Sequence, residues 1–211
     1  ATGAETADSR KVPVQVMDGT VKALVELPSC GAVALIPATQ PAEPEYIAAV
    51  TEENPAASVT ETEDGFLMEN TQIRACVNSR GEVISFIFKE SGREFAAEPM
   101  NRFHLYKDVP RLFDAWDIDS NYREQEVEAA VDVKVEIQSQ GLEAILKVTG
   151  RISESSYTQY IRLAADSRRL VFDTEVDWKE LHRLWKTAFP VQVYAENGIN
   201  EMQFGYVERP A

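Results

Sequence analysis

The sequence predicts an all-β protein with the architecture of an antiparallel β-sandwich. Apolar residues alternate with period two in many short segments, turn-forming residues separate these segments, and no βαβ rhythm occurs. The 211 residues, 44% of them hydrophobic, are sufficient for one large domain or two small ones. We therefore expect a large sandwich preceded by strands of a smaller β domain.

The first part of the chain is predicted to form the smaller β domain. Residues 12–16 (VPVQV) alternate, and residues 21–27 and 31–36 are further extended runs. Residues 38–55 are rich in proline and are typical of a linker. The expected division is a disordered or expression-derived start at residues 1–11, strands of a small β domain plus a proline-rich linker at 12–55, and the first part of the large sandwich at 56–211.

Strand pairs with turn residues between them characterise the predicted sandwich. Residues 59–63 and 66–69 flank Asp64 and Gly65, a sequence typical of a tight hairpin. Further alternating runs lie on either side of short polar segments, and we expect them to pair in the same way. They are residues 73–77 with 83–88, 131–137 with 142–148, and 157–163 with 170–176.

One short segment favours a helix. Leu181, Leu184 and Trp185 follow the i, i+3, i+4 spacing of an apolar helical stripe within residues 179–186. The segment is shorter than three helical turns, so neighbouring strands could override this preference.

The charge of the chain argues against nucleic acid as a partner. The formal net charge is −14, and no cluster of Lys and Arg is present to displace counterions from phosphates. No run approaches the ~18 apolar residues that a membrane helix needs. Cys30 and Cys76 are too few for a disulfide scaffold and lie among apolar residues, so we expect buried free thiols and a cytoplasmic location.

Motifs for metal binding and catalysis are missing from the sequence. His104 and His182 are far apart and share no zinc-ligand spacing with a cysteine. The run from Asp117 to Glu128 resembles the ligand positions of an EF-hand loop, but Tyr122 occupies the position that requires glycine. No nucleophile elbow or phosphate-binding loop occurs. We expect no metal site and no catalytic residue in this chain.

Residues 101–122, NRFHLYKDVPRLFDAWDIDSNY, combine aromatic and acidic side chains in an unusual density. Sugar sites use aromatic faces against the C–H face of a pyranose and carboxylates as acceptors for hydroxyls. Composition alone favours a long packed loop, and a sugar site is the alternative. The residues concerned are Phe103, Tyr106, Phe113, Trp116, Tyr122, Asp108, Asp114, Asp117 and Asp119.

Three motifs in order resemble the carboxy-terminal β region of glycoside hydrolase family 38, the α-mannosidases. They are the run at residues 101–119, the run EVDWKELHRLWKTAFPVQV at 175–193, and MQFGYVERP at 202–210. Residues 69–94 also resemble the opening hairpin of the family's large sandwich. The resemblance implies a partial super-sandwich of the galactose mutarotase-like type, excised from a longer retaining, zinc-dependent α-mannosidase.

Within such a parent, the resemblance implies that this module is non-catalytic. The zinc, its His and Asp ligands and the Asp nucleophile are expected in a missing α/β domain, which with a helical domain would be the packing partner. Mannose-containing oligosaccharides are the expected ligands. Tyr106, Asp114, Trp116 and Asp117 are the candidates for the rim of the sugar pocket. Unpaired sheet edges of an excised sandwich also make a homo-oligomer an expectation.

Two other functions remain open at the level of the sequence. An autonomous carbohydrate-binding sandwich would use the same aromatic and acidic residues on an exposed platform. A free-standing aldose epimerase would use His104 and His182 as acid and base on one sugar.

Overall fold

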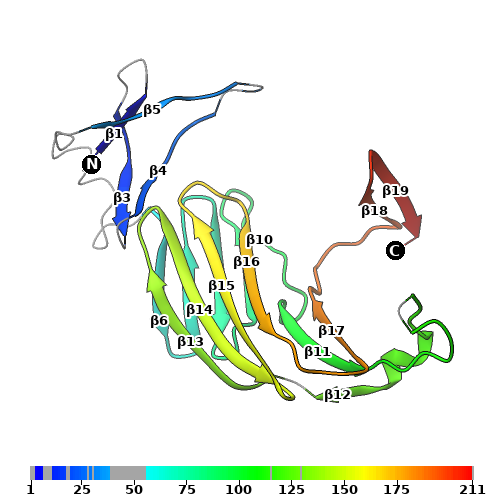
Figure 1. The fold of residues 1–211 in the computed structure, drawn as a ribbon. Coiled ribbons are helices and arrows are strands. Elements are labelled where there is room, and N and C mark those ends of the chain that lie inside the picture. The colour runs from blue at the N-terminus through cyan, green and yellow to red at the C-terminus, as the bar shows by residue number, and fades with distance from the viewer. Residues whose placement is uncertain are drawn as a thin grey trace.

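The computed structural model describes residues 3–6, 11–17, 20–27, 29, 31–38, 56–114, 116–128 and 130–210. Two antiparallel sheets face each other at its centre (Figure 1). One sheet has the order β10-β9-β8-β7-β6 and the other the order β13-β14-β15-β16. The strands of the first are β6 (Ser58–Thr62), β7 (Gly65–Glu69), β8 (Ile73–Asn78), β9 (Val83–Phe88) and β10 (Arg93–Glu94). Those of the second are β13 (Val131–Ser139), β14 (Glu143–Ile152), β15 (Ser155–Ala164) and β16 (Leu170–Asp177).

The hydrophobic core lies between these two sheets. Met68 and Ile73 of the first sheet share one buried cluster with Leu146, Ile161 and Leu163 of the second. In β15 buried residues alternate with more accessible ones, which is the period-two pattern expected of a strand with one face on a core. The predicted antiparallel sandwich and its strand pairs are therefore confirmed.

A third sheet, of order β12-β11-β17, continues from one end of the sandwich (Figure 1). It consists of β11 (Arg102–Lys107), β12 (Glu126–Glu128) and β17 (Arg183–Ala188), and the short 3₁₀ helix η1 (Ser120–Glu124) precedes β12. Phe103 of β11 and Trp185 of β17 pack on the sandwich core, with their ring centroids 4.8 Å apart. This packing fixes the start of β11 against the sandwich.

The helix predicted at residues 179–186 is wrong. β17 pairs with β11 over its whole length, from Arg102 opposite Ala188 to Lys107 opposite Arg183. Leu181, which would have belonged to the apolar stripe of the helix, is 83% exposed. Pairing with a distant strand outweighs the local helical spacing, because an isolated helix of this length is marginal.

The amino-terminal strands form a separate small β unit. Its sheets have the orders β2-β1-β5 and β3-β4. The strands are β1 (Gly3–Thr6), β2 (Lys11–Val12), β3 (Val14–Met17), β4 (Thr20–Ala23) and β5 (Leu35–Ala38). The expectation that residues 1–11 precede this unit needs correction, because β1 pairs with both β2 and β5. Most of the predicted linker, residues 39–55, lies outside the described residues.

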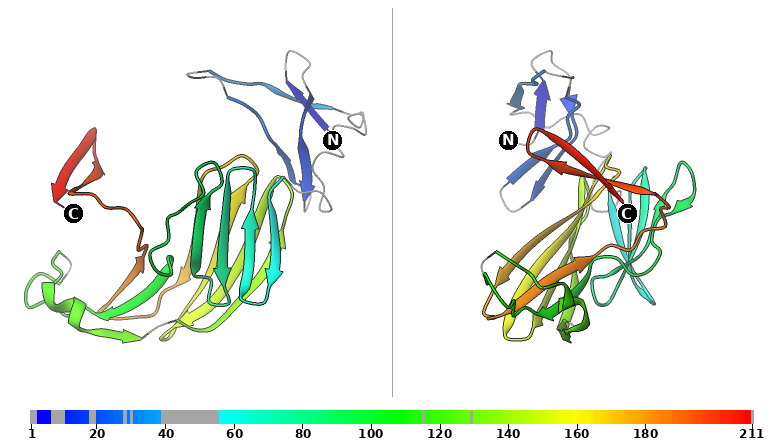
Figure 2. Two further views of the ribbon diagram at one scale, coloured as in Figure 1. Left: turned by 180° about the vertical axis from the view of Figure 1, so that it is seen from behind. Right: turned by 90° about the vertical axis from the view of Figure 1, so that its right-hand side faces the viewer.

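A last hairpin, β18 (Asn197–Met202) with β19 (Gly205–Pro210), lies apart from the sandwich (Figures 1 and 2). Among the described strands each pairs only with the other. Ile199, Phe204 and Tyr206 are exposed on it. A two-stranded hairpin is marginally stable by itself, so this one depends on packing that the described residues do not supply.

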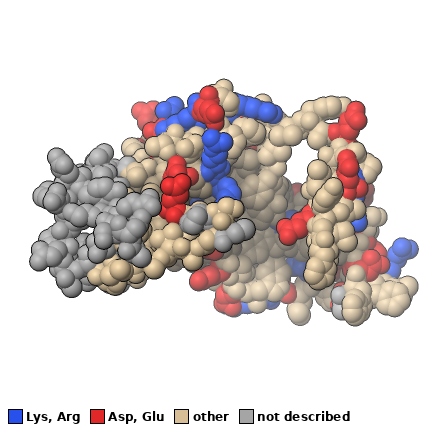
Figure 3. Space-filling view, turned by 90° about the horizontal axis from the view of Figure 1, so that it is seen from above, with Lys and Arg blue, Asp and Glu red and all other residues tan. Residues whose placement is uncertain are grey.

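Charged residues of both signs are interspersed on the face shown in Figure 3, with wide uncharged areas between them. No described helix is long and apolar enough to cross a membrane. Cys76 is a free, half-buried thiol whose pKa is raised by burial, whereas Cys30 lies outside the described residues.

Candidate functional site

The predicted site occupies the segment that leaves β11 and returns through η1 to β12. This segment projects from the end of the molecule that lies away from the amino-terminal strands (Figure 2). Its base is held by two backbone hydrogen bonds: Lys107 N donates to Gln125 O and Asp108 N donates to His182 O, both at 2.9 Å. Residues 109–119 are therefore a loop with a fixed base, hereafter the rim loop.

A tight turn at the tip of the rim loop presents Trp116. The backbone amides of Trp116 and Asp117 both donate to Phe113 O, at 2.7 and 2.9 Å. Phe113 has a left-handed backbone, with φ of 58°. Trp116 is 90% exposed, and Leu112, four residues earlier in the same loop, is exposed as well. The prediction of a packed loop is thus wrong for these side chains. An exposed indole is available to a ligand or to another protein surface.

The acidic residues of the rim loop have different partners. Asp114 Oδ1 lies 3.7 Å from His182 Nδ1. Asp119 Oδ2 accepts from the Arg111 amide at 3.3 Å and lies 3.5 Å from Arg111 Nε. Asp117 is exposed, and no described residue bonds to its carboxylate. Asp117 is therefore the acidic side chain of the loop most accessible to a new hydroxyl partner.

Tyr106 lies on β11 in a cluster with Tyr122 of η1 and Lys186 of β17. The rings of Tyr106 and Tyr122 contact edge to face at 5.2 Å between centroids. Lys186 Nζ donates to Tyr122 Oη at 2.5 Å. This hydrogen bond, followed by one from Arg123, lowers the pKa of the Tyr122 phenol. The cluster fixes Tyr106 at the point where β11 enters the rim loop.

The two histidines lie in different surroundings. His104 Nδ1 is 2.7 Å from Glu126 Oε1, and its ring stacks on Tyr106. His182 faces Asp114 instead. Lys186 lies opposite His104, so at ~3.3 Å per residue the backbone of His182 is roughly 13 Å from that of His104. No contact or shared partner among the described residues joins the two imidazoles, which gives an epimerase site no support.

The structure thus brings one of the four rim candidates, Tyr106, into a cluster and leaves Asp114, Trp116 and Asp117 on the exposed loop. Sequence reasoning missed Lys186 and Glu126, because both reach β11 through pairing with distant strands. The sequence did contain a local signal for the cluster on β11. His104 and Tyr106 are two residues apart, so in a strand their side chains lie on the same face.

No group of three or more His, Cys, Asp or Glu within the described ranges is arranged to hold a metal ion. The EF-hand-like run contains η1, a 3₁₀ turn, and lacks flanking helices. The zinc that the resemblance implies therefore has no ligand set in the described part of this chain.

The two facing sheets, the third sheet and the projecting loop define an antiparallel β-sandwich domain. Residues 68–211 match the model of the glycosyl hydrolases family 38 C-terminal domain. The chain therefore belongs to this family, as its motifs predicted.

Similar proteins agree with this assignment. Alpha-mannosidase 2C1 of Homo sapiens is 32% identical over 196 residues, which cover 89% of this chain and 18% of the relative. Alpha-mannosidase G of Dictyostelium discoideum is 28% identical over 176 residues, 80% of this chain and 16% of the relative. The crystal structure of an alpha-mannosidase from Enterococcus faecalis V583 shares the fold, with a TM-score of 0.61 at 12% identity over 99% of this chain and 28% of the other. The chain thus spans less than a fifth of the length of the human and Dictyostelium relatives.

Proposed function

We propose that the chain is the β-sandwich module of a longer α-mannosidase that cleaves terminal α-mannosides. The family match carries this proposal, since residues 68–211 fit a C-terminal domain and the relatives are mannosidases several times longer. The module packs on a catalytic domain elsewhere in the parent, which supplies the zinc and the bond-breaking residues. The mutarotase-like classification of the sandwich and the cytoplasmic location stay predictions.

The rim loop is the part of the module that we propose to reach the mannose pocket. Its base is hydrogen-bonded to two other elements, so its position is defined, while Trp116 at its tip is 90% exposed. An exposed indole supplies an apolar face for a pyranose, and the free carboxylate of Asp117 accepts hydrogen bonds from hydroxyls. Within the loop, Asp114 faces His182 of the turn before β17. Tyr106 supports the base of the loop from β11 through its ring contact with Tyr122.

Kinetics of the full-length parent enzyme test this role. We expect Trp116→Ala to raise KM for a mannoside by about tenfold, a loss of ~1.4 kcal/mol of binding, with kcat changed less. Tyr194→Ala is the matched control, because Tyr194 is as exposed as Trp116 but lies outside the rim loop. A fall in kcat with KM unchanged would place Trp116 in the chemical step and contradict a rim role. Equal effects of both substitutions would show that the rim loop does not contribute to the mannose pocket.

The alternative of an autonomous sugar-binding module rests on the same exposed indole. Calorimetric titration of the 211-residue chain with a mannoside distinguishes an autonomous module from the proposed rim role. Micromolar affinity that is lost in Trp116→Ala would favour the autonomous module, whereas the proposed rim needs the catalytic domain to complete the pocket and predicts no such affinity at this loop.

A further inference from the structure

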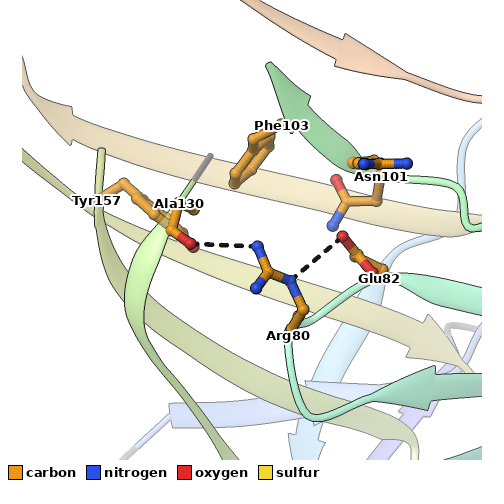
Figure 4. Close-up of a pocket in the computed structure, with 7 residues that line it drawn as sticks. Arg80, Glu82, Asn101, Phe103, Ala130 and Tyr157 are labelled. Atoms are coloured by element: carbon orange, nitrogen blue, oxygen red, sulfur yellow. Dashed lines mark hydrogen bonds and ion pairs between the residues drawn. The ribbon is translucent and has the colours of Figure 1, made fainter. Parts of the chain in front are cut away.

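A cavity of about 460 Å³ opens at the junction of the two central sheets and β11 (Figure 4). Its walls come from the turn between β8 and β9, the start of β11, the residue before β13, and β15. This volume is within the range of about 300 to 1,000 Å³ that is typical of small-molecule sites. None of the four rim candidates lines it. The cavity is therefore distinct from the rim loop.

One wall of the cavity is made rigid by a buried pair of amides. Asn101 is 4% exposed, and its Nδ2 donates to Gly81 O at 2.9 Å and to Gln159 Oε1 at 2.6 Å. Gln159 Nε2 donates in turn to Asn101 Oδ1 at 3.2 Å and to Thr174 Oγ1 at 2.9 Å. These amides are satisfied by each other and by the protein, so they shape the site and leave ligand binding to other groups.

Tyr157 supplies an unused hydroxyl to the cavity. The residue is 3% exposed and lines the wall, yet no described residue forms a hydrogen bond with its Oη. Tyr157 Oη is not among the buried side-chain atoms without a partner, which in the described residues are Arg183 Nε and Trp185 Nε1, so this hydroxyl keeps some exposure to solvent. Burial raises the pKa of Tyr157 to about 12, so the group is a neutral donor and acceptor near pH 7. A ligand hydroxyl is a suitable partner for it.

Arg80 and Glu82 add a donor and an acceptor side by side. Arg80 Nε lies 3.6 Å from Glu82 Oε1, and its Nη2 donates to Ala130 O at 3.2 Å. Figure 4 shows the guanidinium between these two acceptors. The opposite charges of the pair offset each other, which favours a neutral ligand over an anion. Phe103 contributes an aromatic wall.

We propose that this cavity is a second carbohydrate site that takes one neutral sugar ring. The donor and acceptor of Arg80 and Glu82 match adjacent ring hydroxyls, Tyr157 pairs with a further hydroxyl, and Phe103 contacts the apolar C–H face. The site is separate from the rim loop, so a negative result at this cavity would not contradict the proposed mannosidase role.

Titration of the isotope-labelled 211-residue chain with methyl α-mannoside, followed by NMR, tests the site. We expect saturable shifts of the amide signals of Arg80 and Glu82 and of the Asn101 side-chain amide. Tyr157→Phe keeps the ring and removes the hydroxyl, and should weaken the affinity about tenfold without lowering the thermal midpoint. Tyr160→Phe, on the same strand, is the matched control and should leave the affinity unchanged.

Three results would overturn the proposal. The first is the absence of saturable shifts at these signals. The second is an equal affinity in Tyr157→Phe and the unsubstituted chain. The third is inorganic phosphate producing the same shifts at lower concentration than the mannoside, which would make the cavity an anion site based on Arg80.

Discussion

The side chain of Gln15 lies directly over Gly141 and joins the small β unit to the sandwich. Gln15 Nε2 donates to Gln140 O and Gln15 Oε1 accepts from Leu142 N, both at 2.7 Å. The carboxamide thereby pairs with the backbone on both sides of Gly141. A Cβ at Gly141 would lie 2.4 Å from Gln15 Nε2, and the residue has φ of 135°, so glycine is required for this approach.

Removal of either partner should loosen this junction. Gln15→Ala removes the hydrogen bonds to Gln140 O and Leu142 N, and we expect a loss of about 1–3 kcal/mol in the free energy of unfolding. Gly141→Ala adds backbone strain and displaces the carboxamide, so its cost should be larger. Urea unfolding of the 211-residue chain measures both.

The double variant is the control for this junction. Because Gly141→Ala already displaces Gln15, the additional cost of Gln15→Ala in that background should be small. Costs that simply add would show that the two residues act independently and would contradict the contact.

Asn101 should be among the most sensitive polar positions of the sandwich. Asn101→Ala removes the three hydrogen bonds of its buried amide and places an alanine at φ of 60°, so we expect a loss of about 2–4 kcal/mol. Asn101→Gly tolerates the backbone and should cost less by ~1 kcal/mol.

Urea unfolding compares these variants with Asn121→Ala, an exposed substitution in η1 that should change stability by less than about 0.5 kcal/mol. If Asn101→Ala were no more destabilising than Asn121→Ala, the buried amide pair would not contribute to the fold.

Glu94 should make stability depend on pH in the acid range. Burial alone would raise the pKa of this carboxylate, but hydrogen bonds from Ser85 Oγ and from the amides of Phe86, Ala96 and Phe95 outweigh burial and lower it. Because the folded pKa is below the unfolded one, the stabilisation is present above about pH 4.3 and is lost as the pH falls through the folded pKa.

Urea unfolding at a series of pH values measures this dependence. In Glu94→Gln the decline of stability below about pH 4.3 should be shallower, and Ser85→Ala should reduce it in part. An unchanged decline in Glu94→Gln would assign the acid sensitivity to other carboxylates.

The phenol of Tyr122 should ionise at lower pH than an ordinary tyrosine. Lys186 donates to its oxygen and is the main cause of the lowered pKa, so Lys186→Met should raise that pKa. Difference titration of phenolate absorbance between the two proteins isolates the contribution of this residue from the other tyrosines. Identical titration curves would mean that Lys186 and Tyr122 do not interact in solution.

The strand pairs were predictable because their signals are local. The hairpin turn consists of Glu63 and Asp64, one residue before the predicted Asp64 and Gly65, and Gly65 follows it opposite Thr62 at φ of 139°. The segment at residues 179–186 was mispredicted because its partner, β11, is about 80 residues distant and no local pattern reveals that pairing. Gln15 was interpreted as one of the alternating residues of a strand, and its contact with Gly141 depends on the placement of two units.

The location of the candidate site stays a prediction from the sequence. It rests on the motif at residues 101–119 and on the aromatic and acidic composition of that segment, which includes Trp116 and Asp117. The sequence could not show that Trp116 would be exposed and Tyr106 clustered with Tyr122, because both depend on how η1 folds back on β11. The cavity at Tyr157 had no sequence signal, since it is formed by four separate segments.

The most direct test of the central claim is a mannosidase assay of the 211-residue chain beside its full-length parent, both with zinc added. We predict that the parent hydrolyses 4-nitrophenyl α-mannoside and that the chain alone shows no turnover, because the proposed function assigns the zinc and the bond-breaking residues to another domain of the parent. Turnover by the chain well above background, lost in His104→Ala, would contradict the account of a non-catalytic module.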